Sequence, residues 1–262
     1  MVTFRFISVS LLLLAGLSLS ASGAEAVAVD GVRIEGRIAA GSGGIVLRTD
    51  SAEVSPETLA RIRLADDSAF VPLVTGVVLS DGSAIRGAIS LRGEAVALES
   101  PRLGRLEFDL NDVSQINFSL PSGEMAGGET PGVLFINGDF LAARFRGASD
   151  GKVFLDSALG DIEVPLERLA AVRLGAPDSV SAPAKVILDN GDRLCGELAA
   201  DGDAIAVSGR YCRFVPRPDA FALIEFPGRM AYASDLPVAV STQGFAPEGV
   251  DYATLDKAPN GV

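Results

Sequence analysis

Short runs of alternating apolar and polar residues, separated by glycines, fill the chain after its first 24 positions. In the stretch VILDNGDRLCGEL (186–198), apolar residues flank the turn dipeptide Asn190-Gly191 on both sides. Apolar residues that alternate over a few positions are typical of half-buried strands, and Asn-Gly between two such runs is typical of a tight hairpin. Helical periodicity over eleven or more residues is hard to find in this part of the chain. The pattern therefore predicts an all-β protein.

This hairpin pattern occurs four times. Its turn glycines are 51, 56 and 53 residues apart, and Asp or Asn precedes each one: Gly31, Gly82, Gly138 and Gly191. Apolar residues stand three positions before each glycine and three and seven positions after it, so they share one face of a strand pair. Small residues five positions after the glycines predict a bulge, a bend or a close backbone approach: Gly36, Gly87, Ala143 and Gly196.

Each repeat continues beyond its hairpin. A third apolar run lies fourteen to seventeen residues after the turn glycine, and two repeats show a fourth run, at 106–108 and 162–164. Every repeat then ends with apolar residues at i, i+3 and i+5, as in Leu59, Ile62 and Leu64. A step of three followed by a step of two predicts one helical turn that leads into a closing strand. Each repeat is thus about five short strands, and units this small are marginal alone, so we expect adjacent repeats to pack together.

This order of elements resembles the SH3-like and Sm-like small β-barrels, whose strands also run through V-x-L-x-[DN]-G-x-x-x-x-G to a one-turn helix and a closing strand. The resemblance covers nearly every repeat. It implies four tandem small barrels but no particular activity, because such barrels carry many unrelated functions. The RNA binding of Sm proteins is not expected here, because no basic stripe or row of stacking aromatics lines one face.

The first 24 residues are typical of a secretory signal peptide. Arg5 precedes an apolar run that extends to Leu19, and the small residues Ser22, Gly23 and Ala24 follow. The run is too short for a confident membrane span, so we expect cleavage after Ala24, with Ala26 as the second choice. An uncleaved anchor is the alternative. After cleavage we expect an exported protein, periplasmic or extracellular, without a stable membrane span.

The chain is acidic, with a formal net charge of −12 that becomes one unit more negative when Arg5 is removed. Binding to nucleic acid depends on Lys and Arg that neutralise phosphates. Nucleic acid is therefore not an expected partner.

Both cysteines lie in the fourth repeat, at Cys195 and Cys212. Cys195 aligns with Glu35, Arg86 and Ala142 of the other repeats, and positions that carry charge elsewhere are expected to face water. Two water-facing cysteines in one repeat of an exported protein favour a disulfide, which would stabilise a loop of this length by about 3 kcal/mol. Two unpaired thiols are the alternative.

Catalytic and metal chemistry find little support in the composition. The chain has no histidine, which excludes Ser-His-Asp and Cys-His catalysis and histidine-ligated zinc, and no phosphate-binding glycine loop occurs. Asp201-Gly202-Asp203 lacks the remainder of a calcium loop and is interpreted as a plain turn. Paired carboxylates could form a glycoside hydrolase, but Asp30 and Asp81 are explained by turns and Glu107 and Glu163 by strand faces. We expect no catalytic residue, no metal site and no cofactor.

The repeat pattern stops after Phe226. Tyr232-Ala233-Ser234-Asp235-Leu236, then Tyr252 and Asn260-Gly261, resemble the opening of the NPCBM module, a carbohydrate-binding jelly roll of secreted bacterial proteins. That module continues for roughly a hundred residues more, and about thirty residues cannot close a jelly roll. The resemblance implies a relation to carbohydrate-associated surface proteins or a truncated version of one.

The expected organisation is a signal peptide (1–24), repeats at 25–66, 71–120, 131–176 and 183–228, a flexible linker at 121–130 between the second and third, and a C-terminal segment at 229–262. The leading hypothesis for function is a non-enzymatic binding or spacer module, associated with polysaccharide or with cell-envelope proteins. Sugar sites usually stack a ring on aromatics, and here there are only Tyr211, Tyr232 and Tyr252 beside no tryptophan. A scaffold for protein–protein contacts is the second hypothesis, and a carboxylate-dependent glycoside hydrolase the third.

Overall fold

A computed structural model describes residues 23–41, 44–64, 73–119, 130–178, 181–202 and 204–229. Within these residues every strand pairing is antiparallel, and the only helices are four 3-10 turns of three residues each. The predicted all-β class is therefore confirmed. No helix in the described ranges is long and apolar enough to cross a membrane.

One order of elements occurs four times: a hairpin, strands that extend it, a 3-10 turn, and a closing strand that pairs with the first strand. Repeat 1 comprises β1 (Ala24–Ala28), β2 (Arg33–Gly41), β3 (Gly44–Arg48), β4 (Glu53–Val54), η1 (Pro56–Thr58) and β5 (Leu59–Arg63). Repeat 2 comprises β6 (Gly76–Leu79), β7 (Ala84–Arg86), β8 (Ala88–Arg92), β9 (Ala95–Ser100), β10 (Gly104–Asp109), η2 (Leu110–Asp112) and β11 (Val113–Asn117).

The other two repeats follow the same order. Repeat 3 comprises β12 (Gly132–Phe135), β13 (Phe140–Ser149), β14 (Lys152–Ser157), β15 (Gly160–Pro165), η3 (Leu166–Arg168) and β16 (Leu169–Arg173). Repeat 4 comprises β17 (Ala184–Leu188), β18 (Arg193–Asp201), β19 (Ala204–Ser208), β20 (Arg213–Phe214), η4 (Pro218–Ala220) and β21 (Phe221–Glu225). No pairing among the described strands closes the sheet of a repeat into a barrel.

The four hairpin turns are built alike. The turn glycines Gly31, Gly82, Gly138 and Gly191 have φ between +81° and +90°, which side chains with a Cβ rarely adopt. In every turn the Asp or Asn before the glycine accepts a hydrogen bond through Oδ1 from the backbone N–H two residues later. The sequence pattern thus encodes both the backbone conformation and a local side-chain hydrogen bond.

The small residues five positions after the turn glycines allow the third strand of the repeat to approach. A Cβ added to Gly196 would lie 2.4 Å from the Ser208 carbonyl oxygen, and one on Gly87 would lie 2.5 Å from the Glu99 carbonyl oxygen. Repeat 3 has Ala143 at this position, and its strand pair instead shifts register between Phe145 and Gly147.

The closing strands join the repeats in two pairs, 1 with 4 and 2 with 3. Strand β5 pairs with β21, and the contact is reciprocal: Leu64 N donates to Ala222 O at 2.8 Å and Phe226 N to Ala60 O at 2.9 Å. Strands β11 and β16 exchange the equivalent bonds at 2.8 Å. The four acceptors share one position in the repeat and are small and buried: Ala60, Ser114, Ala170 and Ala222.

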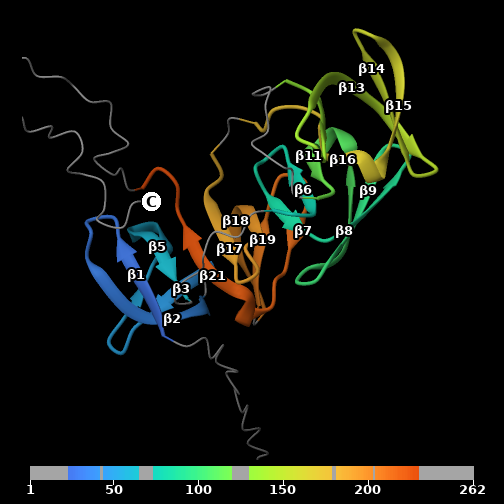
Figure 1. The fold of residues 1–262 in the computed structure, drawn as a ribbon. Coiled ribbons are helices and arrows are strands. Elements are labelled where there is room, and N and C mark those ends of the chain that lie inside the picture. Colours follow the sequence, from blue (N-terminus) through green and yellow to red (C-terminus); the bar gives the residue numbers. More distant parts are fainter. Residues whose placement is uncertain are drawn as a thin grey trace, which may run out of the picture.

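This arrangement corrects the expectation that repeats pack with their neighbours in sequence. Repeats 2 and 3 do so, but repeat 1 pairs with repeat 4. Figure 1 shows β1 and β5 beside β21, with β6, β11 and β16 in the other part of the molecule. One apolar cluster extends through repeats 1, 2 and 4, and repeat 3 has a separate cluster around Val133, Val153 and Leu155.

Several predicted segments lie outside the described residues: 1–22 of the signal peptide, 121–129 of the flexible linker, and 230–262 of the C-terminal segment, with Tyr232 and Tyr252. Strand β1 begins at Ala24, the residue before the expected cut, and Ala24 is buried and pairs with Gly36. Cleavage after Ala24 would remove one residue of β1, whereas cleavage after Ala26 would remove three of its five.

Candidate functional site at the junction of repeats 2 and 4

Repeats 2 and 4 meet through their hairpin turns. We define the turn face of a repeat as the residues from two before to four after its turn glycine, which are 29–35, 80–86, 136–142 and 189–195 in repeats 1 to 4. Across the junction, Arg86 N donates to Asp192 Oδ1 at 2.8 Å and Cys195 N donates to Ser83 Oγ at 2.9 Å. Each acceptor stands one position after its turn glycine and each donor four positions after. The junction therefore has a local two-fold symmetry.

Further contacts join the two turn faces. Arg193 Nε donates to the Gly82 carbonyl oxygen at 2.9 Å, and Arg193 and Ala84 form a short antiparallel bridge between β18 and β7. Ser83 and Asp192 are fully buried by this contact. The junction is therefore a specific polar interface between the two repeats.

On one side of the local two-fold axis the polar groups are fully paired. Asp192 Oδ1 accepts from Arg86 N and, at 3.3 Å, from Arg86 Nη1, while Asp192 Oδ2 accepts from Asn190 Nδ2 at 2.9 Å. The buried carboxylate thus has a hydrogen bond on each oxygen and a guanidinium beside it. A buried ion pair needs such supporting hydrogen bonds to offset its desolvation.

On the other side a carboxylate oxygen is left unpaired. Asp81 Oδ1 accepts from Ser83 N at 2.9 Å, but Asp81 Oδ2 is buried and accepts no hydrogen bond from any described residue. The symmetry explains the difference, because Cys195 occupies the position that Arg86 occupies opposite. A Cβ on Gly82 would lie 3.8 Å from Cys195 Sγ, and one on Gly191 would lie 3.0 Å from Arg86 Nη1. A thiol therefore replaces a guanidinium beside Asp81.

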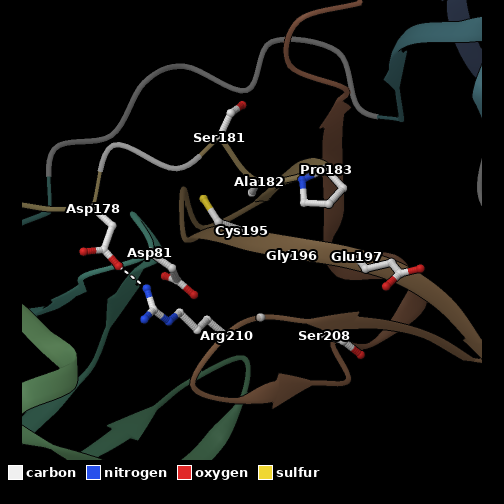
Figure 2. A pocket seen from close by; sticks show the side chains of 11 residues that line it. Asp81, Asp178, Ser181, Ala182, Pro183, Cys195, Gly196, Glu197, Ser208 and Arg210 are labelled. Carbon is white, nitrogen blue, oxygen red and sulfur yellow. Dashed lines mark hydrogen bonds and ion pairs between the residues drawn. The ribbon is translucent and has the colours of Figure 1, made fainter.

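A cavity of about 280 Å³ opens beside Asp81. Strand β18 contributes Cys195 and Glu197, and the segment before β17 contributes Asp178 and Pro183. Figure 2 shows Asp81 between β18 and the ion pair that Asp178 forms with Arg210. Asp178 also binds repeat 2, since its backbone N donates to the Ser80 carbonyl oxygen at 2.6 Å. Among the charged residues that line the cavity, Asp81, Asp178 and Glu197 are acidic and Arg210 is basic, whereas the Asp81 Oδ2 atom itself is buried.

The two thiols are poorly suited to nucleophilic chemistry. Burial raises the pKa of the Cys195 thiol, Arg193 partly opposes the shift, and the Asp81 charge adds to it. Burial likewise raises the pKa of Cys212. The thiolate is the reactive form of cysteine, so both side chains are protonated and weakly nucleophilic at neutral pH.

The predicted disulfide is not formed, because Cys195 and Cys212 are separate free thiols. The underlying assumption is wrong for Cys195, which is only 8% exposed. Alignment with charged residues predicts a water-facing position, but in repeats 2 and 4 this position lies in the junction. Glu35 and Ala142, the equivalents in repeats 1 and 3, are exposed as expected.

Metal and carboxylate chemistry find no assembled site in the described part of the chain. No group of three or more His, Cys, Asp or Glu side chains there could hold a metal ion. Asp201 forms an ion pair with Arg213 at 3.0 Å, and Gly202 has φ of +60°, as in a plain turn; Asp203 lies outside the described residues. Glu163 pairs with Lys152 at 3.0 Å, and Glu107 is exposed on β10 in a different repeat.

Sequence reasoning missed the junction. The sequence predicts that Asp81 is a turn residue, which it is, but it does not indicate that Ser83 and Asp192 accept hydrogen bonds from another repeat. A signal does exist in the alignment of repeats: two positions before the turn glycine, repeats 2 and 4 have Ser80 and Asp189, whereas repeats 1 and 3 have Val29 and Ile136. That contrast separates two kinds of turn face but does not reveal which faces meet.

Comparison with known proteins gives no relative: no family model, no curated protein and no solved structure matches this chain.

Proposed function

We propose that this protein is a non-enzymatic, exported scaffold of four SH3-like or Sm-like small β-barrel repeats, whose turn faces bind protein partners. One observation carries the proposal. The turn face that joins repeats 2 and 4 is also present in repeats 1 and 3, where it is exposed and carries apolar residues: Val29 and Val32 are 48% and 55% exposed, and Ile136 is 47% exposed.

These side chains are unusual within the described residues. They are half of the six large apolar side chains that are exposed there, and the other three are Val74, Leu159 and Val215. Exposed apolar residues that gather at a surface already shaped for contact mark an interaction site. In repeats 2 and 4 the turn faces contact each other through polar side chains. The exposed apolar side chains occur only in the turn faces that have no such contact within the described residues, those of repeats 1 and 3.

The barrel assignment is supported by the order of elements, in which a 3-10 turn precedes each closing strand as in the small barrels that the sequence resembles. Export is supported by the signal-like sequence of residues 1–24. A non-enzymatic role is supported by the protonated thiols and by the ion pairs that Glu163 and Asp201 form with Lys152 and Arg213.

Carbohydrate binding is supported by the resemblance of residues 232–261 to the NPCBM module, and not by any described side chain. Tyr211 hydrogen-bonds to Asp178 at 3.4 Å through its hydroxyl, and the Arg210 guanidinium lies 5.3 Å from its ring centroid. A ring that already packs against a guanidinium is a poor platform for a sugar. A protein partner is therefore the better-supported ligand.

Site-specific photo-crosslinking in the cells that express the protein tests this function. We expect covalent adducts with protein when the crosslinker replaces Val29 or Ile136, and far fewer when it replaces Leu159, which is 82% exposed but lies in another turn of repeat 3. Equal adducts at all three positions, or none at any, would contradict the scaffold. Specific binding of the purified protein on a glycan array would instead support the carbohydrate alternative.

A further inference from the structure

We infer that the turn face of repeat 1 is covered by a segment of this same chain, residues 230–236, which follow directly after repeat 4. This inference rests on the proposed function, in which this face binds a protein partner, and adds a regulation to it, because a partner must first displace the segment. Three features of the molecule support it: the place where repeat 4 ends, the course of the equivalent segment after repeat 3, and the residues at equivalent positions.

The chain leaves repeat 4 at the edge of the sheet that carries the turn of repeat 1. Strand β5 pairs with β1 on one side and with β21 on the other, and both neighbours are antiparallel to it. Strands β1 and β21 therefore end at the same edge of the sheet, where β5 begins (Figure 1). There β1 continues into the turn of repeat 1, and β21 continues towards Arg229. The segment that follows Arg229 thus starts beside this turn.

Arg229 holds the start of the segment against repeat 1. Its guanidinium donates to the carbonyl oxygens of Pro56 and Leu59, the latter at 3.2 Å. These two residues flank Thr58, whose carbonyl oxygen accepts a hydrogen bond from Val29 N at 3.0 Å. Seven extended residues span about 23 Å, so the segment is long enough to cross the turn face.

The segment after repeat 3 already binds a turn face. The closing strand β16 pairs with β11 of repeat 2 as β21 pairs with β5 of repeat 1, and Leu174 N donates to Ser114 O as Phe226 N donates to Ala60 O. Four residues after Leu174, the chain reaches the turn face of repeat 2, where Asp178 N donates to the Ser80 carbonyl oxygen at 2.6 Å. A segment that follows a closing strand thus binds the turn face of the paired repeat.

The residues at equivalent positions match in polarity. Ser80 is equivalent to Val29, and Asp178 is equivalent to Met230, the fourth residue after the last strand bond of repeat 4. The Tyr211 hydroxyl contacts Asp178 at 3.4 Å and also the Ser80 side chain, so these two polar side chains lie close together. In repeat 1 the corresponding pair is Val29 and Met230, and both are apolar. A polar segment therefore meets a polar face, and an apolar segment an apolar face.

The path from the closing strand to the turn face differs in one respect. After repeat 4, Pro227 and Gly228 form a β-turn, in which Gly228 has φ of +78° and Arg229 N donates to the Phe226 carbonyl oxygen at 3.3 Å. The turn shifts the path of the chain. The equivalence therefore extends to the face that is covered and not to a single hydrogen bond.

The other long segments outside the described residues begin elsewhere. Residues 1–22 precede β1 and residues 65–72 follow β5, and the pairing of Glu25 with Arg63 places these strand ends at the edge opposite the turn of repeat 1. Residues 120–129 connect repeats 2 and 3, which form the other pair. Of these segments, the one after Arg229 is therefore the best placed to reach this face.

A photo-crosslinker at position 29 of the purified full-length chain tests this inference. We expect a bond within one molecule, from position 29 to the tryptic peptide 230–257, which contains no internal Lys or Arg. Fragmentation of the crosslinked peptide by mass spectrometry should place the bond within 230–236. A crosslinker at position 136, the equivalent position of repeat 3, is the matched control and should not label this peptide. Absence of the bond from position 29, or equal labelling from position 136, would overturn the inference.

Val29→Asp tests the apolar contact itself. Asp189 occupies this position in repeat 4, so the fold is expected to tolerate the substitution, and circular dichroism verifies that it does. We expect chymotrypsin to cleave after Tyr232 about tenfold faster in Val29→Asp, because the rate follows the population of the undocked segment. Ile136→Asp is the matched control and should leave the rate unchanged. Equal cleavage rates in Val29→Asp and the unmodified protein would overturn the inference.

The proposed function and this inference can fail separately. In cells, Met230→Asp should increase the adducts that a crosslinker at position 29 forms with other proteins, and leave those at position 136 unchanged. The internal bond without adducts to any other protein would overturn the scaffold function and leave the covered face without its regulatory role. Adducts with other proteins, no internal bond and no effect of Met230→Asp would overturn this inference and leave the scaffold function standing.

Discussion

The two kinds of contact between repeats differ in what they demand of the sequence. The closing-strand contacts pair backbone with backbone, and the side chains at the crossing, such as Ala60 and Ala222, only have to be small. The turn-face contact between repeats 2 and 4 depends on particular side chains, because Ser83 and Asp192 accept the hydrogen bonds that hold it.

This difference explains why all four repeats use the first kind of contact while only two use the second within the molecule. A small residue stands at the closing-strand position in every repeat, so any two repeats could form a continuous sheet. A matched set of polar groups occurs only in the turn faces of repeats 2 and 4. The turn faces therefore determine which repeat meets which, and substitutions there should separate the two kinds of contact.

Removal of the buried acceptor should have the largest effect. We expect Asp192→Ala to lower the free energy of unfolding by about 3–5 kcal/mol, because it leaves Arg86 without its buried carboxylate and removes a backbone acceptor. Chemical denaturation monitored by circular dichroism measures this change. The matched control is Asp139→Ala, at the equivalent but exposed position of repeat 3, which should change stability by less than about 0.5 kcal/mol. Equal effects of the two substitutions would mean that the junction contributes no specific stability.

Enlarging a small residue between closing strands should have the next largest effect. Ala222 is fully buried where β21 meets β5, and Ala222→Leu is expected to cost about 1–3 kcal/mol through overpacking. Ala88→Leu, on an exposed position of β8, is the control, and both variants are compared by thermal denaturation. A stable Ala222→Leu protein would show that the closing-strand contact tolerates large side chains.

Much of this fold could be predicted from the sequence. Each turn glycine is preceded by Asp or Asn, and those residues directly determine the positive φ and the Oδ1 hydrogen bond seen in all four turns. Such features depend on residues close together in the chain. The i, i+3, i+5 spacing has a different origin from the predicted one: the 3-10 turn ends before the first of these residues, and the step of three is a register shift within the closing strand, at Ala60, Ser114, Ala170 and Ala222.

The candidate site could not be predicted in the same way, because it depends on residues 112 positions apart. The aligned positions predict that Cys195 faces water, and only the contact between repeats 2 and 4 buries it. The alternation along a strand gives the face on which a residue lies, but not which other repeat covers that face. The unpaired oxygen of Asp81 is likewise a consequence of that long-range contact.

Neutralising the unpaired carboxylate should raise stability. Asp81→Asn keeps the Oδ1 acceptor for Ser83 N, gives repeat 2 the Asn-Gly turn of repeats 3 and 4, and replaces a half-buried carboxylate whose Oδ2 accepts no hydrogen bond from the described residues, so we expect a gain of about 1 kcal/mol. Asp30→Asn is the matched control, because Asp30 accepts the same turn hydrogen bond in repeat 1 but is exposed. Urea denaturation of both variants measures the difference. A loss of stability in Asp81→Asn would indicate that Oδ2 has a favourable partner in solution.

The smallest expected effect is a dependence of stability on alkaline pH that arises from Cys195. Burial raises the pKa of this thiol above its ordinary value, so the folded protein retains the proton after the unfolded chain has lost it. The resulting stabilisation is fully present below the ordinary thiol pKa, near 8.5, and is lost as pH rises through the higher pKa of the folded state. We therefore expect the free energy of unfolding to fall less steeply above that pH in Cys195→Ser than in the unmodified protein.

Comparison with Cys212→Ser locates this effect in the junction. Burial also raises the pKa of Cys212, but its side chain is only partly buried, so its replacement should flatten the pH dependence less. Tyrosine ionisation affects all three proteins alike and cancels in the comparison. Because Cys195 stands where repeat 2 has Arg86, its pH dependence reports directly on the side of the turn-face contact that lacks an ion pair. A Cys195→Ser protein with an unchanged slope would mean that this thiol reaches water in solution and that the contact between repeats 2 and 4 opens readily.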